Sequence, residues 1–277
     1  MKRGLIGILC LVCAVAQAEQ KFFVFDNGLQ DVRSSEDQAK LLKKLGYDGI
    51  CTRPAKCTPK LLAAFDKHKV TVAISYVTLG ANSKIIPANI VTHIESLKGR
   101  ETMIWLALTD ANAPDKNAVS VIRQVCKLAK ANGLETVLYH HINFRTDTIA
   151  RTEHLRKLAD CPGLGISFNL CHFLAQNDPG KLDETLRSIA QNLKLVLLSG
   201  ANRLDSPKPD WSQLILPLGE GDFDMHRVFQ TLKEIAYDGP VALQCYKVPG
   251  PAATHLSNSM HAWRGYNNQD KNQGAQP

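Results

Sequence analysis

The amino-acid sequence predicts an α/β protein built as one (β/α)8 TIM barrel. Short apolar runs alternate along the chain with segments whose apolar residues recur at the 3.6-residue spacing of an amphipathic helix. Polar side chains follow the ends of the apolar runs, which is where such barrels carry their functional sites. With 277 residues, 44% of them hydrophobic, the chain has the ordinary length of a single barrel domain.

The stretch 216–246 contains one complete unit of this alternation. A glycine-rich loop precedes a helix that Asp222 or Asp224 would cap, and Asp238-Gly239-Pro240 ends the helix. An apolar run then leads to Gln244 and Tyr246, as expected for a parallel strand covered on both faces. The sequence LGYDGI at 45–50 resembles IAYDGP at 235–240, so the same helix-to-strand turn occurs twice.

The other units follow the same pattern. We expect strands at 22–25, 50–52, 70–77, 103–108, 136–138, 165–168, 195–198 and 241–246. We expect helices at 38–45, 59–68, 87–97, 117–132, 147–159 and 181–192, in the segment 222–236, and finally at 255–264. The barrel domain would span 19–266, and the polar tail 267–277 is predicted to be disordered.

The first 18 residues have the features of a cleavable signal peptide. Lys2 and Arg3 precede an apolar run, and Ala16-Gln17-Ala18 has the small-x-small pattern of a signal-peptidase site. We therefore expect export, either to a periplasm or out of the cell, with cleavage after Ala18. The apolar run is short for a membrane span, and no later segment approaches ~20 apolar residues, so no integral membrane segment is expected.

A lipid-anchored form is the weaker alternative for the N-terminus. Cys13 follows Val12, whereas a lipoprotein signal has a small residue before its cysteine. Of the 8 cysteines, Cys10 and Cys13 would leave with the signal peptide. The remaining cysteines form no CxxC motif or regular framework, so buried thiols are expected, with Cys51 and Cys57 as the local pair to consider.

The charge balance does not indicate a nucleic-acid-binding protein. Removing residues 1–18 takes two lysine or arginine residues from the 33, which leaves 31 against 26 acidic residues, or a net charge of +5. The positive side chains are scattered over predicted outer helix faces, which is typical of a solvated surface. The sequence does not specify an oligomeric state.

Three motifs at predicted strand ends resemble those of one family. PLGEGDFD followed by LKEIAYDGPVALQ, at 217–244, is similar to the loop, helix and last strand of the xylose isomerase-like TIM barrels. This superfamily of sugar phosphate isomerases and epimerases includes ketose 3-epimerases and AP endonuclease family 2. FNLCH at 168–172 resembles its D-x-x-H motif, and LYHH at 138–141 stands where relatives carry Leu-Glu. The resemblance covers about 22–266 and implies a small carbohydrate as the partner.

The resemblance also implies a divalent metal held by Glu, Asp, His and Glu at the ends of strands five to eight. Tyr139, Asn169 and Gln244 stand at three of these positions, and the histidine position falls within Leu197-Leu198-Ser199. Because a divalent cation needs carboxylate or imidazole donors, we expect no metal cofactor. Tyr139 and Gln244 are also no bases near neutral pH, so the proton transfer between two glutamates cannot be carried over.

Four side chains are candidate acids or bases. His172 matches the histidine of D-x-x-H, which contacts the sugar in ketose epimerases, with a buried structural imidazole as the alternative. His141 has the parity of Tyr139 and would face the mouth, whereas the adjacent His140 would pack against a helix. The other candidates are loop carboxylates, for which helix or loop capping is the alternative: Asp110 and Glu220.

Six side chains are candidate substrate-binding residues: Tyr139, Asn169, Gln244, Arg53, Arg145 and Tyr246. The amides of Asn169 and Gln244 would recognise hydroxyl groups, while a loop salt bridge is the alternative for each arginine. Trp105 and Trp211 could stack on a sugar ring, although a tryptophan inside a strand is more often part of the core.

Two functions remain open from the sequence. The first is an exported isomerase, epimerase or lyase that moves a proton on a sugar without the metal of its relatives. The second is a barrel that binds a sugar without catalysis. A nuclease is not expected, because the chain lacks the large His, Asp and Glu set of a three-metal site.

Overall fold

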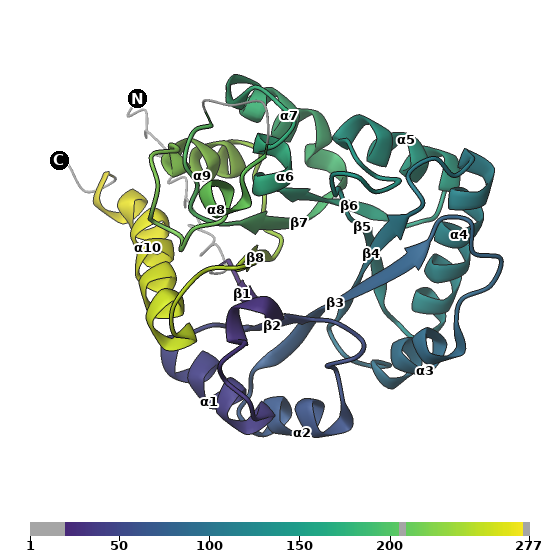
Figure 1. The fold of residues 1–277 in the computed structure, drawn as a ribbon, viewed down its shortest axis with the longest axis horizontal. Helices are drawn as coiled ribbons and strands as arrows, with labels where there is room; N and C mark the ends of the chain where they lie inside the picture. The colour runs from purple at the N-terminus through teal and green to yellow at the C-terminus, as the bar shows by residue number, and fades with distance from the viewer. Residues whose placement is uncertain (1–19, 205–208, 274–277) are drawn as a thin grey trace, which may run out of the picture.

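The computed structural model describes residues 20–204 and 209–273. The predicted signal peptide and the residues after Gln273 lie outside this range. Eight parallel strands pair in chain order and close on themselves, because β1 pairs with β2 on one side and with β8 on the other (Figure 1). The predicted single (β/α)8 barrel is therefore confirmed.

The strands lie close to the predicted ranges. They are Phe22–Phe25 (β1), Gly49–Thr52 (β2), Thr71–Gly80 (β3), Met103–Thr109 (β4), Glu135–Leu138 (β5), Gly165–Asn169 (β6), Leu193–Leu198 (β7) and Val241–Leu243 (β8). β3 runs three residues beyond its predicted end, because its pairing with β4 continues to Gly80 and Thr109. β8 ends at Leu243, three residues before the predicted end, so Gln244 to Tyr246 belong to the mouth.

An outer ring of helices covers the barrel (Figure 1). It consists of Ser35–Leu45 (α1), Pro59–Lys67 (α2), Ala88–Ser96 (α3), Asp115–Ala131 (α4), Ile149–Ala159 (α5), Leu182–Ile189 (α7), Met225–Glu234 (α9) and Ala252–Gln273 (α10). Hydroxyl and carboxylate caps fix several starts: Ser34, Thr58, Thr148 and Asp224 each accept a hydrogen bond from a backbone N–H of the first turn. Of the two predicted caps for α9, Asp224 is the one used.

Two short helices, Leu170–Leu174 (α6) and Trp211–Leu214 (α8), were not predicted. Each is a single turn or little more within a loop at the mouth, too short to show a helical period in the sequence. The last helix also differs from the prediction. α10 continues past Arg264 to Gln273, so the segment from Asn267 that was predicted to be disordered begins as helix. No helix in the described ranges is long and apolar enough to cross a membrane.

Buried apolar side chains form two clusters, separated by the wall of the barrel. The larger cluster lies between strands and helices, and the smaller one fills the barrel interior around Trp105. The Trp105 indole donates from Nε1 to Ser167 Oγ at 2.9 Å and is fully buried, so it is part of the core and not a surface on which a sugar could stack.

Cys51 belongs to the inner cluster and Cys57 to the outer one, and both are free thiols. These two cysteines are therefore buried thiols, as expected by default, and do not form the local pair that their spacing left open.

In both copies of the repeated turn, a residue with a left-handed backbone conformation follows the helix and a tyrosine comes directly after it. Gly46 and Ala236 occupy corresponding positions with φ of 91° and 51°. The strand that follows the first copy begins at Gly49, where β2 and β3 approach closely: a Cβ added to Gly49 would lie 2.0 Å from the carbonyl oxygen of Thr71. Only glycine fits there without moving a strand.

We expect Gly49→Ala to lower the free energy of unfolding by about 2 to 3 kcal/mol, because the added methyl group overlaps backbone and not a flexible side chain. Gly265→Ala is the matched control: its Cβ would meet nothing within 4 Å in the middle of α10, so the substitution should be neutral or stabilise the fold by up to about 1 kcal/mol. Urea denaturation followed by circular dichroism measures both. Equal stability of the two variants would contradict the strand contact.

Candidate functional site

A cavity of about 380 Å³ opens at the carboxyl-terminal end of the barrel. Most of its lining residues lie in or directly after strands β1, β2, β3, β5, β6 and β8, so the closed sheet itself assembles the cavity. The remaining lining side chains come from or next to α8. The residues are Phe25, Asn27, Arg53, Tyr76, Tyr139, His141, Ile142, Asn143, Cys171, His172, Trp211, Ile215, Gln244 and Tyr246.

Tyr139, Asn169 and His172 form a hydrogen-bonded chain beneath one side of the cavity. Asn169 Nδ2 lies 2.9 Å from Tyr139 Oη, and Tyr139 Oη lies 3.1 Å from His172 Nε2. Cys171 Sγ donates to Asn169 Oδ1 at 3.1 Å, which identifies the other side of the amide as the NH2 group. Asn169 is fully buried and does not line the cavity itself.

The direction of these bonds assigns the protons of His172. The Tyr139 oxygen accepts from Asn169, so its own proton goes to His172 Nε2, and a neutral His172 carries its proton on Nδ1. That Nδ1 is buried with no partner in the described part of the chain. Burial, together with His141 and His140 nearby, holds the pKa of His172 well below its ordinary value. Neither ring nitrogen is open to a ligand, which favours the structural interpretation of His172.

His141 has the opposite arrangement. Its Nδ1 lies 2.7 Å from the carbonyl oxygen of Ile142, so the N–H is directed at that acceptor, and Nε2 has no hydrogen-bond partner within 20–204 and 209–273. The ring stacks on Phe144 with centroids 3.9 Å apart and lies 4.1 Å from His172. Burial lowers the pKa of His141. At neutral pH its Nε2 is therefore an unprotonated acceptor on the cavity wall.

His140 points away from the cavity, as the strand alternation predicts. It is fully buried, its Nε2 lies 3.4 Å from Gln176 Oε1 beyond α6, and it does not line the cavity. Burial lowers the pKa of His140 to about 4. This imidazole is neutral at physiological pH and belongs to the packing between barrel and helices.

The opposite side of the mouth presents hydrogen-bond donors. Gln244 Oε1 accepts from Asn27 Nδ2 at 2.6 Å and from the backbone N–H groups of Cys245 and Tyr246 at 3.1 and 3.2 Å. Arg53 is held by Asp26, which accepts from Nη2 at 2.6 Å and from Nε at 3.1 Å. Asp26 is 4% exposed, so it orients the guanidinium group and is not itself available to a ligand.

Besides Asn169, three predicted site residues do not line the cavity. Asp110 turns away directly after β4 with a φ of 57°, and its carboxylate accepts from the backbone N–H of Asn82. Arg145 is buried and forms an ion pair with Asp115 at the start of α4. Glu220 is exposed on the glycine-rich loop. Each of these three side chains lies outside the cavity. Asp110 and Arg145 make loop contacts of the kind considered as alternatives to a functional role.

The sequence did not single out Asn27 or Tyr76 as site residues. Asn27 is the second residue after β1, and Tyr76 interrupts the apolar run of β3. Tyr76 packs edge-on to Tyr139, with ring centroids 5.5 Å apart. The available signals were a polar side chain just beyond a strand end for Asn27 and a hydroxyl-bearing side chain within an apolar strand for Tyr76.

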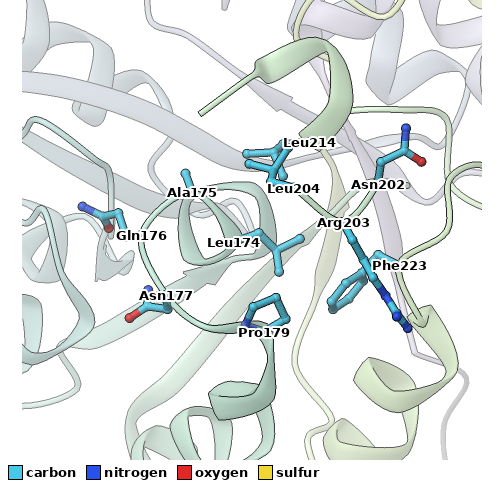
Figure 2. A pocket seen from close by; sticks show the side chains of 10 residues that line it. All are labelled: Leu174, Ala175, Gln176, Asn177, Pro179, Asn202, Arg203, Leu204, Leu214 and Phe223. Carbon is cyan, nitrogen blue, oxygen red and sulfur yellow. The ribbon is translucent and has the colours of Figure 1, made fainter. Parts of the chain in front are cut away.

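A second cavity of about 360 Å³ is lined by Leu174 of α6, Leu214 of α8 and residues of the neighbouring loops (Figure 2). Leu174 and Phe223 face each other across it, with Gln176 and Asn177 on one side and Asn202 and Arg203 on the other. The Asn202 and Asn177 amides bond to Gln213 Oε1 and to the carbonyl oxygen of Phe173. Because these two amides form hydrogen bonds that hold their own loops, we take the barrel mouth, and not this cavity, as the candidate site.

The mouth residues do not suit the divalent metal that the resemblance implies. Burial keeps the pKa of Tyr139 well above its ordinary value, so the phenol stays protonated. The oxygens of Asn169 and Gln244 are engaged as acceptors, and Ser199 Oγ donates to the carbonyl oxygen of Leu214. The described residues contain no group of three His, Cys, Asp or Glu side chains arranged to hold a metal. A hard cation would find neutral, already bonded donors.

Together, a closed parallel barrel and a cavity of aromatic and polar side chains at its carboxyl-terminal mouth define a TIM-barrel protein with a candidate small-molecule site. The model of the family described as xylose isomerase-like TIM barrel matches residues 39–264. The chain belongs to this family, which confirms the resemblance seen in the sequence.

Individual relatives are distant. An uncharacterized protein of Methanocaldococcus jannaschii is 27% identical over 131 residues, which are 46% of this chain and 42% of that protein, so the match spans less than half of either. The 3-keto-D-glucoside 4-epimerase of E. coli superposes with a TM-score of 0.70 at 16% identity, covering 88% of this chain and 98% of the epimerase. A probable 3-DHS dehydratase of Bacillus anthracis gives 0.68 at 15% identity, with 88% and 98% coverage. At these identities the structures share the fold.

The buried position of His172 leads to a stability prediction. We expect His172→Ala to lower the free energy of unfolding by about 2 to 4 kcal/mol, because it removes a buried imidazole and the partner of the Tyr139 hydroxyl. His261→Ala, on the exposed face of α10, should change stability by no more than about 0.5 kcal/mol. Thermal or urea denaturation measures both. Unchanged stability of His172→Ala, with a roughly 10²-fold loss of turnover, would restore the catalytic role.

We also expect no stoichiometric Mg²⁺, Mn²⁺ or Zn²⁺ at the mouth, because its oxygens are neutral and already bonded. Elemental analysis of the purified protein after mild dialysis tests this. One equivalent of metal that disappears in Gln244→Ala, but persists in His261→Ala, would contradict the argument from the donor set.

Proposed function

We propose that this protein is an exported carbohydrate-active enzyme that transfers a proton on a sugar or sugar derivative without a metal. The reaction would be of the isomerase, epimerase or lyase type, and His141 would be the base. The observation that carries the proposal is the open Nε2 of His141 on the wall of a cavity lined mostly by aromatic and polar side chains.

The composition of the cavity supports a carbohydrate ligand. Aromatic rings of Tyr76, Trp211 and Tyr246 provide flat apolar surfaces, while Arg53 and Gln244 provide hydrogen-bond donors. A sugar ring presents the same combination of apolar faces and polar edges. Of the tryptophans considered, Trp211 lines the cavity, and its ring meets His172 edge-on with centroids 5.3 Å apart.

The histidine pair supports a proton transfer. The Nδ1–H of His141 is directed at the carbonyl oxygen of Ile142, so the ring is oriented before any ligand arrives and Nε2 can accept a proton. The Tyr139 to His172 bond holds His172 against the His141 ring and prevents it from turning toward the ligand. In this scheme His141 exchanges the proton, and His172 and Tyr139 are positioning residues.

Structural relatives and the predicted export narrow the substrate class. The related structures include a 3-keto-D-glucoside 4-epimerase and a D-allulose 3-epimerase. Their substrates, by name, are sugars, which supports carbohydrate chemistry for this chain. Export through the predicted signal peptide favours an unphosphorylated sugar, because sugar phosphates are usually cytosolic.

A non-catalytic sugar-binding protein is the alternative, and one observation favours it. The lining residues of the mouth include no carboxylate, and the nearest one, Asp26, is buried against Arg53. A proton transfer at this site would depend on one histidine, whereas the binding of a sugar requires only the donors and rings already present. An enzyme of the proposed type would exchange a carbon-bound hydrogen of the sugar with solvent, whereas a binding protein would not, so this exchange distinguishes the two functions.

The test is deuterium incorporation into sugars incubated with the protein in D₂O and analysed by mass spectrometry, with ketohexoses and keto-glucosides as probes. We expect exchange at the carbon next to the carbonyl group, and a loss of roughly 10²-fold or more in His141→Gln. His154→Gln, on the outside of the barrel, should leave the rate unchanged.

The exchange rate should also depend on pH in a defined direction. The unprotonated form of His141 is the active one, and its pKa is lowered by burial. The rate should therefore be level through neutral pH and fall only when the pH drops below the ordinary histidine value of about 6.5. Binding of a probe with no exchange at any pH would favour the non-catalytic alternative.

A further inference from the structure

We infer that one side of the mouth binds the carbonyl or carboxylate oxygen of an oxidised sugar, in place of the metal used by relatives. Three side chains form this donor edge: Asn27, Arg53 and Gln244. The inference rests on the proposed function and names its substrate class. Sugars that carry a C=O group, such as keto sugars, lactones and sugar acids, would bind in preference to polyols.

The barrel topology gathers the donor edge. β8, β1 and β2 are consecutive in the closed sheet, and Gln244, Asn27 and Arg53 each follow one of these strands. The Asn27 to Gln244 hydrogen bond of 2.6 Å ties two of the three side chains together. The donor edge is therefore a continuous feature of one side of the cavity.

Gln244 can offer only its NH2 group to a ligand. Its Oε1 accepts from two backbone N–H groups, which cannot themselves accept, so the oxygen and nitrogen of the amide are assigned without ambiguity. Its Nε2 has no protein partner among the described residues and belongs to a side chain that lines the cavity. Asn27 is constrained in the same way, because its Oδ1 accepts from the backbone N–H of Cys245.

Arg53 contributes charge and further donors. Asp26 accepts from Nε and Nη2, which leaves Nη1 without a protein partner in the described ranges, and the guanidinium side chain is 43% exposed. Asp26 also accepts from Thr52 Oγ1 and from the backbone N–H of Arg53, so its position is fixed from several directions. The guanidinium group is thus held in one orientation before a ligand arrives.

A donor edge of this kind selects oxygens that only accept. A carbonyl or carboxylate oxygen can accept from any of these donors and needs no acceptor in return. A hydroxyl group can accept as well, but its own hydrogen needs an acceptor, and the Gln244 amide oxygen already accepts three hydrogen bonds. The mismatch leaves a polar group without a partner, which disfavours the polyol.

The donor edge also lies across the cavity from His141, the proposed base. In the ring of eight strands β5 is opposite β1, so His141 and the donor edge occupy opposite walls. The C–H bond next to the carbonyl group breaks, its proton goes to His141 Nε2, and the electron pair moves onto the carbonyl oxygen as an enolate. Return of the proton to carbon restores the carbonyl group. Fixed donors stabilise the oxygen most when its negative charge develops.

The experiment is calorimetric binding of two matched pairs of sugars, D-gluconate against D-glucitol and methyl α-D-glucuronide against methyl α-D-glucoside. Each pair differs by one oxidised carbon. We expect the oxidised member to bind at least about 10-fold more tightly, and Gln244→Glu to abolish this preference, because it keeps one acceptor for the backbone and replaces the NH2 donor with a negative oxygen.

Arg53→Gln is the second variant, and it should reduce the preference by roughly 10-fold or more. Because it leaves Asp26 buried without its charge partner, its folding is checked first, and Gln244→Glu carries the test if it unfolds. Arg203→Gln, at the second cavity, is the control and should preserve both affinities.

The outcomes distinguish this inference from the proposed function. Equal affinity for the two members of each pair, unaffected by Gln244→Glu, would overturn the donor edge and leave sugar binding intact. No binding of any of the four sugars at millimolar concentration would overturn the donor edge and also count against the proposed function.

Discussion

The pairing of the first and last strands is the constraint on which the rest of the molecule depends. Three residue pairs close the barrel, Phe22 with Val241, Phe23 with Ala242 and Val24 with Leu243. α10 covers this seam: its Trp263 stacks on Phe22 with ring centroids 4.1 Å apart. Above the last pair, the Asn27 to Gln244 bond continues the seam into the mouth. The pairing of β1 with β8 that closes the sheet therefore also positions two residues of the donor edge, Asn27 and Gln244.

Two of the positions at which the resemblance implies metal ligands, those of Tyr139 and Asn169, belong to the buried interior of the barrel. The Tyr139 ring packs at a tilt against Trp105 with centroids 3.8 Å apart, and its hydroxyl group links Asn169 to His172. A carboxylate placed at position 139 alone would therefore lie among aromatic rings beside an amide and would not complete a metal site. Burial would also raise its pKa. Tyr139, Asn169 and His172 are therefore best understood together, as one hydrogen-bonded chain.

The sequence predicted the barrel well because the evidence for it is local. Apolar runs and helix caps are visible within ten residues, and the strand ends could be placed within three positions even for β3 and β8. The site was predicted less well. Arg145 and Asp110 follow strands just as Arg53 does, yet loop geometry turns the first toward Asp115 and the second toward Asn82. No local pattern distinguishes these three residues.

The roles of His141 and His172 also could not be distinguished from local sequence. His141 and His172 both lie at the mouth, and sequence reasoning ranked His172 first because of its motif. What separates them is the partner of a single ring nitrogen: Ile142 holds the Nδ1 of His141 and leaves Nε2 open, whereas Tyr139 occupies the Nε2 of His172. Because those partners come from the folded chain, the protonation state of each ring is a tertiary property.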